Sequence, residues 1–185
     1  MTYVPLIAGI VATGVFGAFV WAVRGHFASV RVPYGMWVVS GLSAGCFVGY
    51  AIALVSWPHP HWLLAVSMVG QGAALALFIW AVHETRSKDL ALAFDPARPT
   101  LLVNSGPFHY IRHPFYSSYL LFWGSAALQL QSAILSFGIA GLAALYVLAA
   151  IGEEREFARS SLAGTYQAYM VGRGRFVPKL FRGRP

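Results

Sequence analysis

The sequence predicts an all-α integral membrane protein with five transmembrane helices, a cytoplasmic catalytic loop and a C-terminal tail. Only 10% of its 185 residues are charged and 58% are hydrophobic, whereas soluble domains carry about 25% charged residues. This composition excludes a soluble enzyme, a disordered chain, a collagen and a coiled coil. Five segments contain no Asp, Glu, Lys or Arg: residues 3–23, 34–57, 62–82, 114–130 and 132–151. We expect the whole chain, residues 1–185, to form a single membrane domain.

Each of the five segments is long enough, or nearly so, to cross a bilayer as a helix. A helix rises about 1.5 Å per residue and the hydrocarbon core is about 30 Å thick, so roughly 20 residues suffice. No basic region precedes residues 3–23, and this stretch is longer than a usual signal-peptide core, so we expect a helix there. Residues 114–130 form the shortest segment and are expected to make a helical hairpin with residues 132–151.

The basic residues predict how the chain is oriented in the membrane. Two lie between the first and second segments, four between the third and fourth, and seven after the fifth. With five spans these three regions share one side, which the positive-inside rule places in the cytoplasm. All six acidic residues fall in the same regions. We therefore expect an outside N-terminus, a cytoplasmic C-terminus carrying the polar chemistry, and a location in a bacterial inner membrane.

The net charge of +7 does not indicate a nucleic-acid partner. The basic excess lies beside the membrane ends, where Lys and Arg orient a protein and meet anionic lipid headgroups. The sequence contains no Walker-type phosphate loop and no Cys/His cluster with zinc spacing, so no metal site is predicted. The one cysteine, Cys46, has no partner for an intramolecular disulfide.

Two polar stretches, the loop from His83 to His113 and the tail from Glu153, are the candidate site. Pro114 suits the first turn of a helix because its missing N–H would be unpaired there. The free N–H groups of that helix end, together with Arg112, would suit a carboxylate or another anion. A flat ring such as adenine is expected among the aromatic residues Phe108, Tyr110, Phe115 and Tyr116.

A plain structural interpretation of the same loop stays open. Arg112 fits a basic membrane anchor, Tyr110 and Tyr116 fit an aromatic belt, and His113 fits a solvated loop residue.

Glu153 and Glu154 place two adjacent carboxylates at the membrane face, where unpaired charge is costly. Arg112 is the first expected cationic partner, and Arg155 or Arg159 the second. A solvated acidic helix end is the alternative, although helix C-termini disfavour acids through the dipole. The position therefore indicates that the helix continues or that the pair has a function.

These residues together resemble a known family. Gly106-x-Phe108, Arg112-His113-Pro114-x-Tyr116 and Glu153-Glu154, with Phe157, Tyr166, Tyr169 and Pro178, are similar to the C-terminal signature of the isoprenylcysteine carboxyl methyltransferases. That family is related to the phospholipid methyltransferases, and both are integral membrane enzymes that use S-adenosyl-L-methionine. The resemblance covers about residues 80–178, roughly half of the chain.

The resemblance implies a cofactor region formed by residues 83–116 and 153–178. Leu102, Val103 and Phe108 would line the adenosyl group, and Glu153 would bind the polar end of the cofactor. The turn would also contact the cofactor, through His113, Pro114, Phe115 and Tyr116. We further hypothesise that Arg112 and Glu154, as catalytic residues, orient the acceptor or the cofactor.

The implied activity is methyl transfer from S-adenosyl-L-methionine to a hydrophobic or lipid-like acceptor at the cytoplasmic membrane face. Family members that methylate isoprenylcysteine carry an arginine where this chain has Ala149. The acceptor therefore stays open among a lipid, an isoprenoid-like carboxylate, a thiol and another small hydrophobic molecule. The sequence leaves the oligomeric state open as well.

Two other classes of function are considered. An NADPH-dependent reductase of the sterol-reductase type would have a similar C-terminal region, with Arg173 and Arg175 as phosphate-binding residues. A non-enzymatic membrane protein, such as a channel, transporter or haem protein, is disfavoured because no charged residue or histidine lies within the five segments.

The stretch from Leu162 to Tyr169 has two expected roles between which the sequence does not choose. It either packs back on the site as a lid or docks as an amphipathic segment on the membrane surface.

Overall fold

The computed structural model describes residues 3–25, 33–86, 101–129 and 132–179. These residues form an all-helical structure, and their only β interaction is an isolated bridge between Ile111 and Gly174. The elements in chain order are α1 Val4–Gly25, α2 Tyr34–Ser56, α3 His61–Thr85, the 3-10 turn η1 Gly106–His109, α4 Pro114–Ala127, α5 Ala133–Ala158 and α6 Ala163–Val171. The predicted all-α class is thus confirmed.

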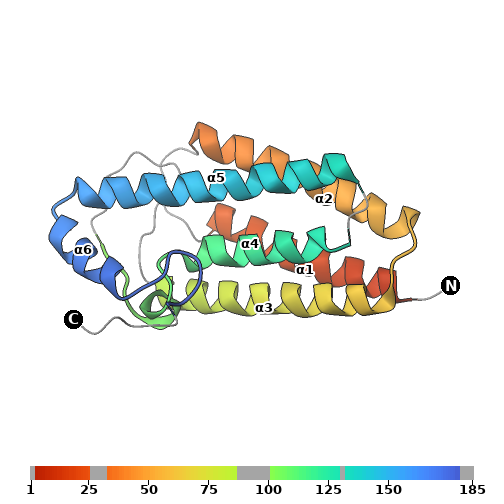
Figure 1. Ribbon diagram of the computed structural model, residues 1–185, viewed down its shortest axis with the longest axis horizontal. Helices are drawn as coiled ribbons and strands as arrows, with labels where there is room; N and C mark the ends of the chain where they lie inside the picture. Colours follow the sequence, from red (N-terminus) through yellow and green to blue (C-terminus); the bar gives the residue numbers. More distant parts are fainter. Residues whose placement is uncertain (1–2, 26–32, 87–100, 130–131, 180–185) are drawn as a thin grey trace.

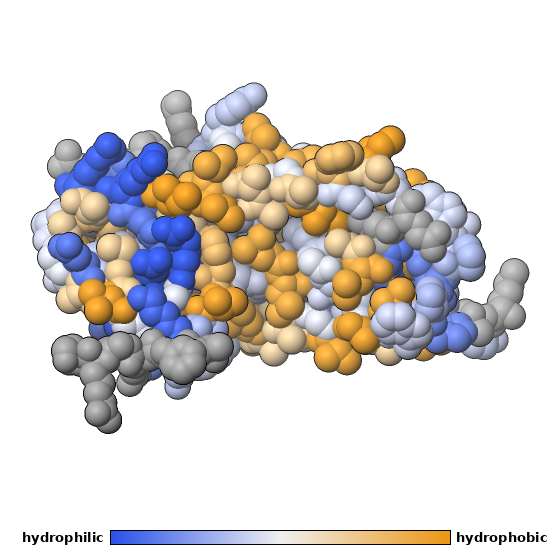
Figure 2. All heavy atoms as spheres, viewed as in Figure 1, coloured by the Kyte–Doolittle hydropathy of each residue, from blue (hydrophilic) through white to orange (hydrophobic). Residues whose placement is uncertain are grey.

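Within the described ranges, four helices are long and apolar enough to cross a membrane: α1, α2, α3 and α5. Large apolar side chains such as Val55, Val69 and Phe137 are more than 70% exposed on them, which is typical of a lipid-facing surface. In Figure 2 hydrophobic residues cover the middle of the elongated molecule, while the strongest hydrophilic patch gathers at one end. These helices indicate a membrane protein.

The fourth predicted segment, residues 114–130, differs from the other four. Its helix α4 has 14 residues, about 21 Å at the usual rise per residue, and it is not among the four candidate spans. It is largely buried, including its small polar residues Ser117 and Ser118. The apolar side chains of this segment therefore pack against other helices, as expected for an apolar stretch of this length. Four of the five predicted spans, and not the fourth, are supported among the described residues.

The boundaries of the other segments lie close to those expected, with one informative exception. Helix α5 does not end near residue 151 but continues to Ala158, so Glu153 and Glu154 stand on an uninterrupted helix. The loop expected from His83 begins only after α3 ends at Thr85, and its residues 87–100 lie outside the described residues.

Helix α4 lies inside the bundle, packed mainly on α3 and also on α5 (Figure 1). Helix α1 packs on α3, and α2 packs on α5. The centre is aromatic: the ring of Phe19 lies 4.8 Å from that of Phe78 and 5.5 Å from that of Phe122, both edge-on. This arrangement brings the N-terminus of α4, the C-terminal end of α5 and helix α6 to one end of the bundle, opposite the first turn of α1 (Figure 1).

Candidate functional site

The site begins with a sharp turn after residues 101–105. Gly106 has φ +56°, and a Cβ there would lie 2.6 Å from Oε2 of Glu84, so glycine is required both for the conformation and for the close approach. The Ser105 hydroxyl donates to Oε1 of the same Glu84 at 2.5 Å. The end of α3 therefore holds the turn that opens η1.

The C-terminal tail then fixes the chain just before α4. The backbone N–H groups of Arg112 and His113 donate to the carbonyls of Gly174 (2.9 Å) and Arg175 (3.1 Å). Pro114 follows in the first turn of α4, as predicted. The Ser117 hydroxyl donates to the carbonyl of Phe176 at 2.8 Å. The tail from Gly174 to Phe176 thus lies as a strap along the start of α4.

Glu154 is the centre of a charged cluster at this end of the bundle. Arg175 forms a bidentate pair with it, donating from Nε to Oε1 at 3.0 Å and from Nη2 to Oε2 at 2.7 Å. Nη2 of Arg112 and Nε2 of His113 both lie 3.2 Å from Oε1. The side chain of Glu154 is 10% exposed. Three segments far apart in the sequence therefore converge on one nearly buried carboxylate.

The expected partners of the glutamate pair are partly confirmed. Arg112 is the first partner, but the expectation that Arg155 or Arg159 is the second is wrong. Arg159 instead pairs with Glu156 on the exposed side of α5 at 3.2 Å, and Arg155 is exposed. The second partner is Arg175 of the tail, because the strap lies along the start of α4 and brings this residue to Glu154.

Glu153 has a different environment from its neighbour. It accepts a short hydrogen bond from the Tyr116 hydroxyl, and its Oε2 lies 3.4 Å from Nδ1 of His113. Its side chain is 38% exposed. Of the two carboxylates, Glu153 is the one with a face open to a further cation.

His113 is buried between the two glutamates and is not a solvated loop residue. Its side chain is 7% exposed and each ring nitrogen faces one carboxylate. Burial lowers the pKa of His113, but hydrogen bonds and charge attraction from Glu153 and Glu154 outweigh burial and raise this pKa above its ordinary value. His113 is the N-cap residue of α4, but its ring faces α5 and makes no hydrogen bond to the backbone of α4.

The aromatic residues of the predicted site separate into two groups. Phe108, Phe115 and Tyr116 are buried, and the rings of Phe108 and Phe115 lie 6.3 Å apart. Val103 belongs to the same buried cluster, while Leu102 is half-buried. Tyr110 is 52% exposed and its ring lies 6.1 Å from that of Trp80, an environment that suits the aromatic-belt interpretation.

Helix α6 packs back on this end of the molecule. The Tyr169 hydroxyl donates to the carbonyl of Phe108 at 2.7 Å, and the ring of Tyr166 stacks on that of Phe157 at 4.4 Å. The guanidinium of Arg173 lies 4.6 Å from the centre of the Tyr169 ring. Of the two roles considered for residues 162–169, packing back on this end of the molecule is observed, while closure over a ligand stays a prediction.

Three buried donors at this end have no hydrogen-bond partner among the described residues: Nε of Arg112, Nε of Arg173 and the hydroxyl of Tyr166. Burial and the charge of Glu154 raise the pKa of Tyr166, while the charge of Arg112 lowers it, so the hydroxyl lies within the field of both residues. Unpaired buried donors are costly. They fit a ligand group that accepts hydrogen bonds, such as a carboxylate or a hydroxyl.

No protein-family model matches this chain, and no curated protein matches it.

Proposed function

We propose that the chain catalyses methyl transfer from S-adenosyl-L-methionine to a hydrophobic or lipid-like acceptor at the charged end of the bundle. The observation that carries the proposal is the convergence of the Arg112-His113-Pro114 turn, the Glu153-Glu154 pair and the tail. Paired charges, unpaired donors and buried aromatic rings thus come together at this end of the bundle.

The donor set fits each part of this cofactor. Its ammonium group would pair with the open face of Glu153. Its carboxylate would accept from two of the unpaired donors, Nε of Arg112 and the hydroxyl of Tyr166. Its adenine would lie against the apolar side chains of this end, which are Leu102, Val103, Phe108 and Phe115.

The bound cofactor would supply a methyl group activated by its positive sulfur. The protein then has to align the acceptor and keep water out, and an acceptor that is already an anion needs no acid or base. We assign Glu154 to positioning, because its carboxylate holds Arg112, His113 and Arg175 together. Tyr116 and His113 in turn fix the carboxylate of Glu153.

We also propose the orientation, with the charged end in the cytoplasm and the first turn of α1 outside. Among the described residues, Lys and Arg lie where α1, α3 and α5 end, or in the turn and tail beside the start of α4, all at this end of the bundle (Figure 1), as the positive-inside rule requires. A bacterial inner membrane fits this proposal. A lipid-like acceptor would then reach the site from the bilayer.

Calorimetric titration of the detergent-purified protein with S-adenosyl-L-methionine and S-adenosylhomocysteine tests the proposal. We expect saturable binding by the wild type. Glu153→Ala removes the proposed partner of the ammonium group, and His113→Ala removes a contact that fixes Glu153, so each should weaken binding about tenfold or more. Glu156→Ala is the matched control, because this neighbouring carboxylate pairs only with the exposed Arg159 among the described residues.

Lack of binding by folded wild-type protein would refute the methyltransferase proposal. Equal weakening by all three variants would show that Glu153 has no specific role. NADPH is the next titrant, since the reductase alternative requires it. The two arginines expected to bind the NADPH phosphate would then have to leave their present partners. Arg175 is paired with Glu154, and Arg173 lies over the Tyr169 ring.

A further inference from the structure

A groove between α1 and α3 lies where both helices end, at the charged end of the bundle (Figure 1). Its volume is about 370 Å³, far more than the roughly 30 Å³ of one water molecule. Helix α1 contributes Ala18 and Trp21 to its wall, and α3 contributes residues between 78 and 86. Both helices are candidate membrane spans, and Trp21 and Ile79 are more than half exposed. The groove therefore opens toward the surrounding lipid.

The wall of this groove changes from apolar to basic along α3. Four of its residues follow the i, i+3, i+4, i+7 pattern of one helix face: Ile79, Val82, His83 and Arg86. Arg86 is the C-cap of α3 and keeps a helical backbone conformation, so the row continues past the last helical residue. From its first to its last member the row spans about 10 Å. A molecule lying along the groove would thus meet hydrocarbon side chains first and two nitrogen donors at the end.

The two donors at the basic end are available to an anion. Arg86 and His83 are exposed, and a histidine ring offers an N–H in either tautomer. No Asp or Glu is among the described residues that line the groove. Glu84, the acid of α3, turns its carboxylate to η1, where it accepts from Ser105. The described acids of α5 pair with His113 and with arginines other than Arg86. An anion in the groove would find two donors and no carboxylate in its wall.

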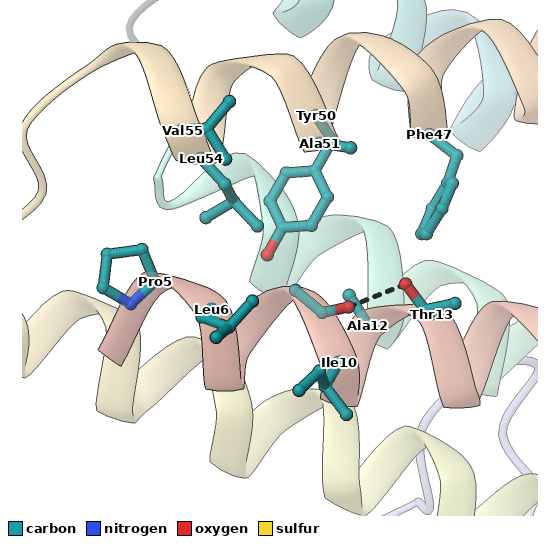
Figure 3. A pocket seen from close by; sticks show the side chains of 11 residues that line it. Pro5, Leu6, Ile10, Ala12, Thr13, Phe47, Tyr50, Ala51, Leu54 and Val55 are labelled. Carbon is teal, nitrogen blue, oxygen red and sulfur yellow. Dashed lines mark hydrogen bonds between the residues drawn. The ribbon is translucent and has the colours of Figure 1, made fainter. Parts of the chain in front are cut away.

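A second groove, between α1 and α2, has a similar volume of about 370 Å³ but no charge, since no Asp, Glu, Lys, Arg or His lines it. In Figure 3 the Tyr50 side chain extends into it from α2, and the Thr13 hydroxyl donates to a carbonyl of its own helix. The Tyr50 hydroxyl is bonded to Gln71 and Gln129. It belongs to an uncharged, buried amide cluster, which consists of Tyr50, Ser67, Gln71 and Gln129. This second groove therefore serves as an internal comparison for the recognition of a charged headgroup.

We propose that the groove between α1 and α3 binds an anionic phospholipid, with an acyl chain in its apolar part and the phosphate at Arg86 and His83. The argument is charge complementarity, because basic pockets between membrane helices bind anionic headgroups. Trp21 in the wall suits the level of the headgroup, where tryptophan is enriched. A phosphatidylcholine would gain less, since its choline brings a second cation to Arg86. The proposal does not depend on methyl transfer.

Photolabelling of the full-length protein in detergent, without any cofactor, tests this proposal. The probes are a phosphatidylglycerol and a phosphatidylcholine that carry the same diazirine-labelled acyl chain, and mass spectrometry of peptides locates the label. We expect phosphatidylglycerol to label residues 18–21 and 78–86 at least about fivefold more than phosphatidylcholine, the effect usual for one basic residue near an anionic lipid. At residues 5–13 and 47–55, in the second groove, the two probes should label equally. Glycerol phosphate, a headgroup without acyl chains, should not compete.

Three variants separate the headgroup site from the apolar part of the groove. Arg86→Gln removes the charge in the groove and should lower the preference for phosphatidylglycerol about fivefold. Arg155→Gln is the matched control, because this arginine is exposed on α5 and does not line the groove; the preference should not change. Ile79→Trp fills the apolar part from an exposed position and should reduce labelling of residues 18–21 and 78–86 by both probes.

Equal labelling of residues 18–21 and 78–86 by the two probes would overturn the proposal. So would an unchanged preference in Arg86→Gln. An equal fall in Arg86→Gln and Arg155→Gln would overturn it as well, because it would indicate attraction to the whole charged end and no separate site. Competition by glycerol phosphate would indicate a phosphate site that does not need an acyl chain. If Ile79→Trp fails to fold, the two arginine variants, both at exposed positions, decide the question.

Discussion

The charged cluster around Glu154 and the amide cluster around Tyr50 are both buried, but their central groups are satisfied to different degrees. The carboxylate of Glu154 is fully paired, because donors of Arg112, His113 and Arg175 fill its capacity of about four hydrogen bonds. In the amide cluster Tyr50 bonds to Gln71 and Gln129, and Gln71 bonds to Ser67, but one atom of each amide has no partner in the described part of the chain. Charge is thus placed at the end of the bundle, where desolvation is less costly, and neutral groups are placed between the long helices.

Removing the shared carboxylate should give the largest effect. Glu154→Ala leaves Arg112, which is 12% exposed, without its anion and also releases Arg175. Breaking such a buried pair costs about 3 kcal/mol, equivalent to a fall of about 9 °C in Tm for a chain of this size. Thermal unfolding in detergent measures it. Glu156→Ala, which loses only an exposed pair, should change Tm by less than about 2 °C; equal shifts would contradict the central role of Glu154.

Detaching the strap should have the next largest effect. A Cβ at residue 174 would lie 1.8 Å from the carbonyl oxygen of Val177, so Gly174→Ala must displace the tail and weaken its bond to Arg112. We expect a loss of about 2 kcal/mol and faster proteolysis of residues 172–179. Gly172→Ala has open space around its new Cβ and should behave as wild type. Unchanged proteolysis of the Gly174 variant would show that the strap does not depend on this close approach.

In the amide cluster, a single substitution should lower the stability of the protein, and adding two further substitutions should restore it. Tyr50→Phe leaves Gln71 and Gln129 without their common partner and should cost about 1 kcal/mol. Adding Gln71→Leu and Gln129→Leu removes all the unpaired groups and should restore much of the loss. Thermal unfolding of the single and triple variants makes the comparison, with the exposed Tyr34→Phe as control. A triple variant less stable than Tyr50→Phe would show that the amides stabilise the bundle.

The difference between the clusters also explains what the sequence could predict. Charged residues are so rare in this chain that Arg112, Glu153 and Glu154 were conspicuous, and their proximity could be inferred from the cost of unpaired charge at the membrane face. The amides gave no such signal, because Gln71 and Gln129 are compatible with an apolar segment. Their meeting at Tyr50 depends on how three helices pack.

Two further features lay beyond the sequence pattern. The sequence does not predict Arg175 as a partner of Glu154, because their pairing requires the tail to return along α4, a long-range contact without local periodicity. The segment at 114–130 was expected to be a span because hydropathy does not distinguish contact with lipid from contact with other helices. The short length of α4, and the burial of Ser117 and Ser118, show that it packs against helices.

The smallest expected effect is a pH dependence from His113, which links the two glutamates. The pKa of His113 is raised in the folded protein, so the folded state holds the proton more tightly than the unfolded state, whose pKa is about 6.5. The stabilisation is therefore complete below about pH 6.5 and is lost as the pH rises through the higher folded pKa. We expect the Tm difference between wild type and His113→Gln to be widest near pH 5.5 and to narrow toward pH 8.5. Glu153→Gln removes one of the two carboxylates that raise this pKa and should flatten the dependence. A difference that is constant with pH would mean that His113 contributes by packing alone, and that charge at this end is balanced by Arg112 and Arg175.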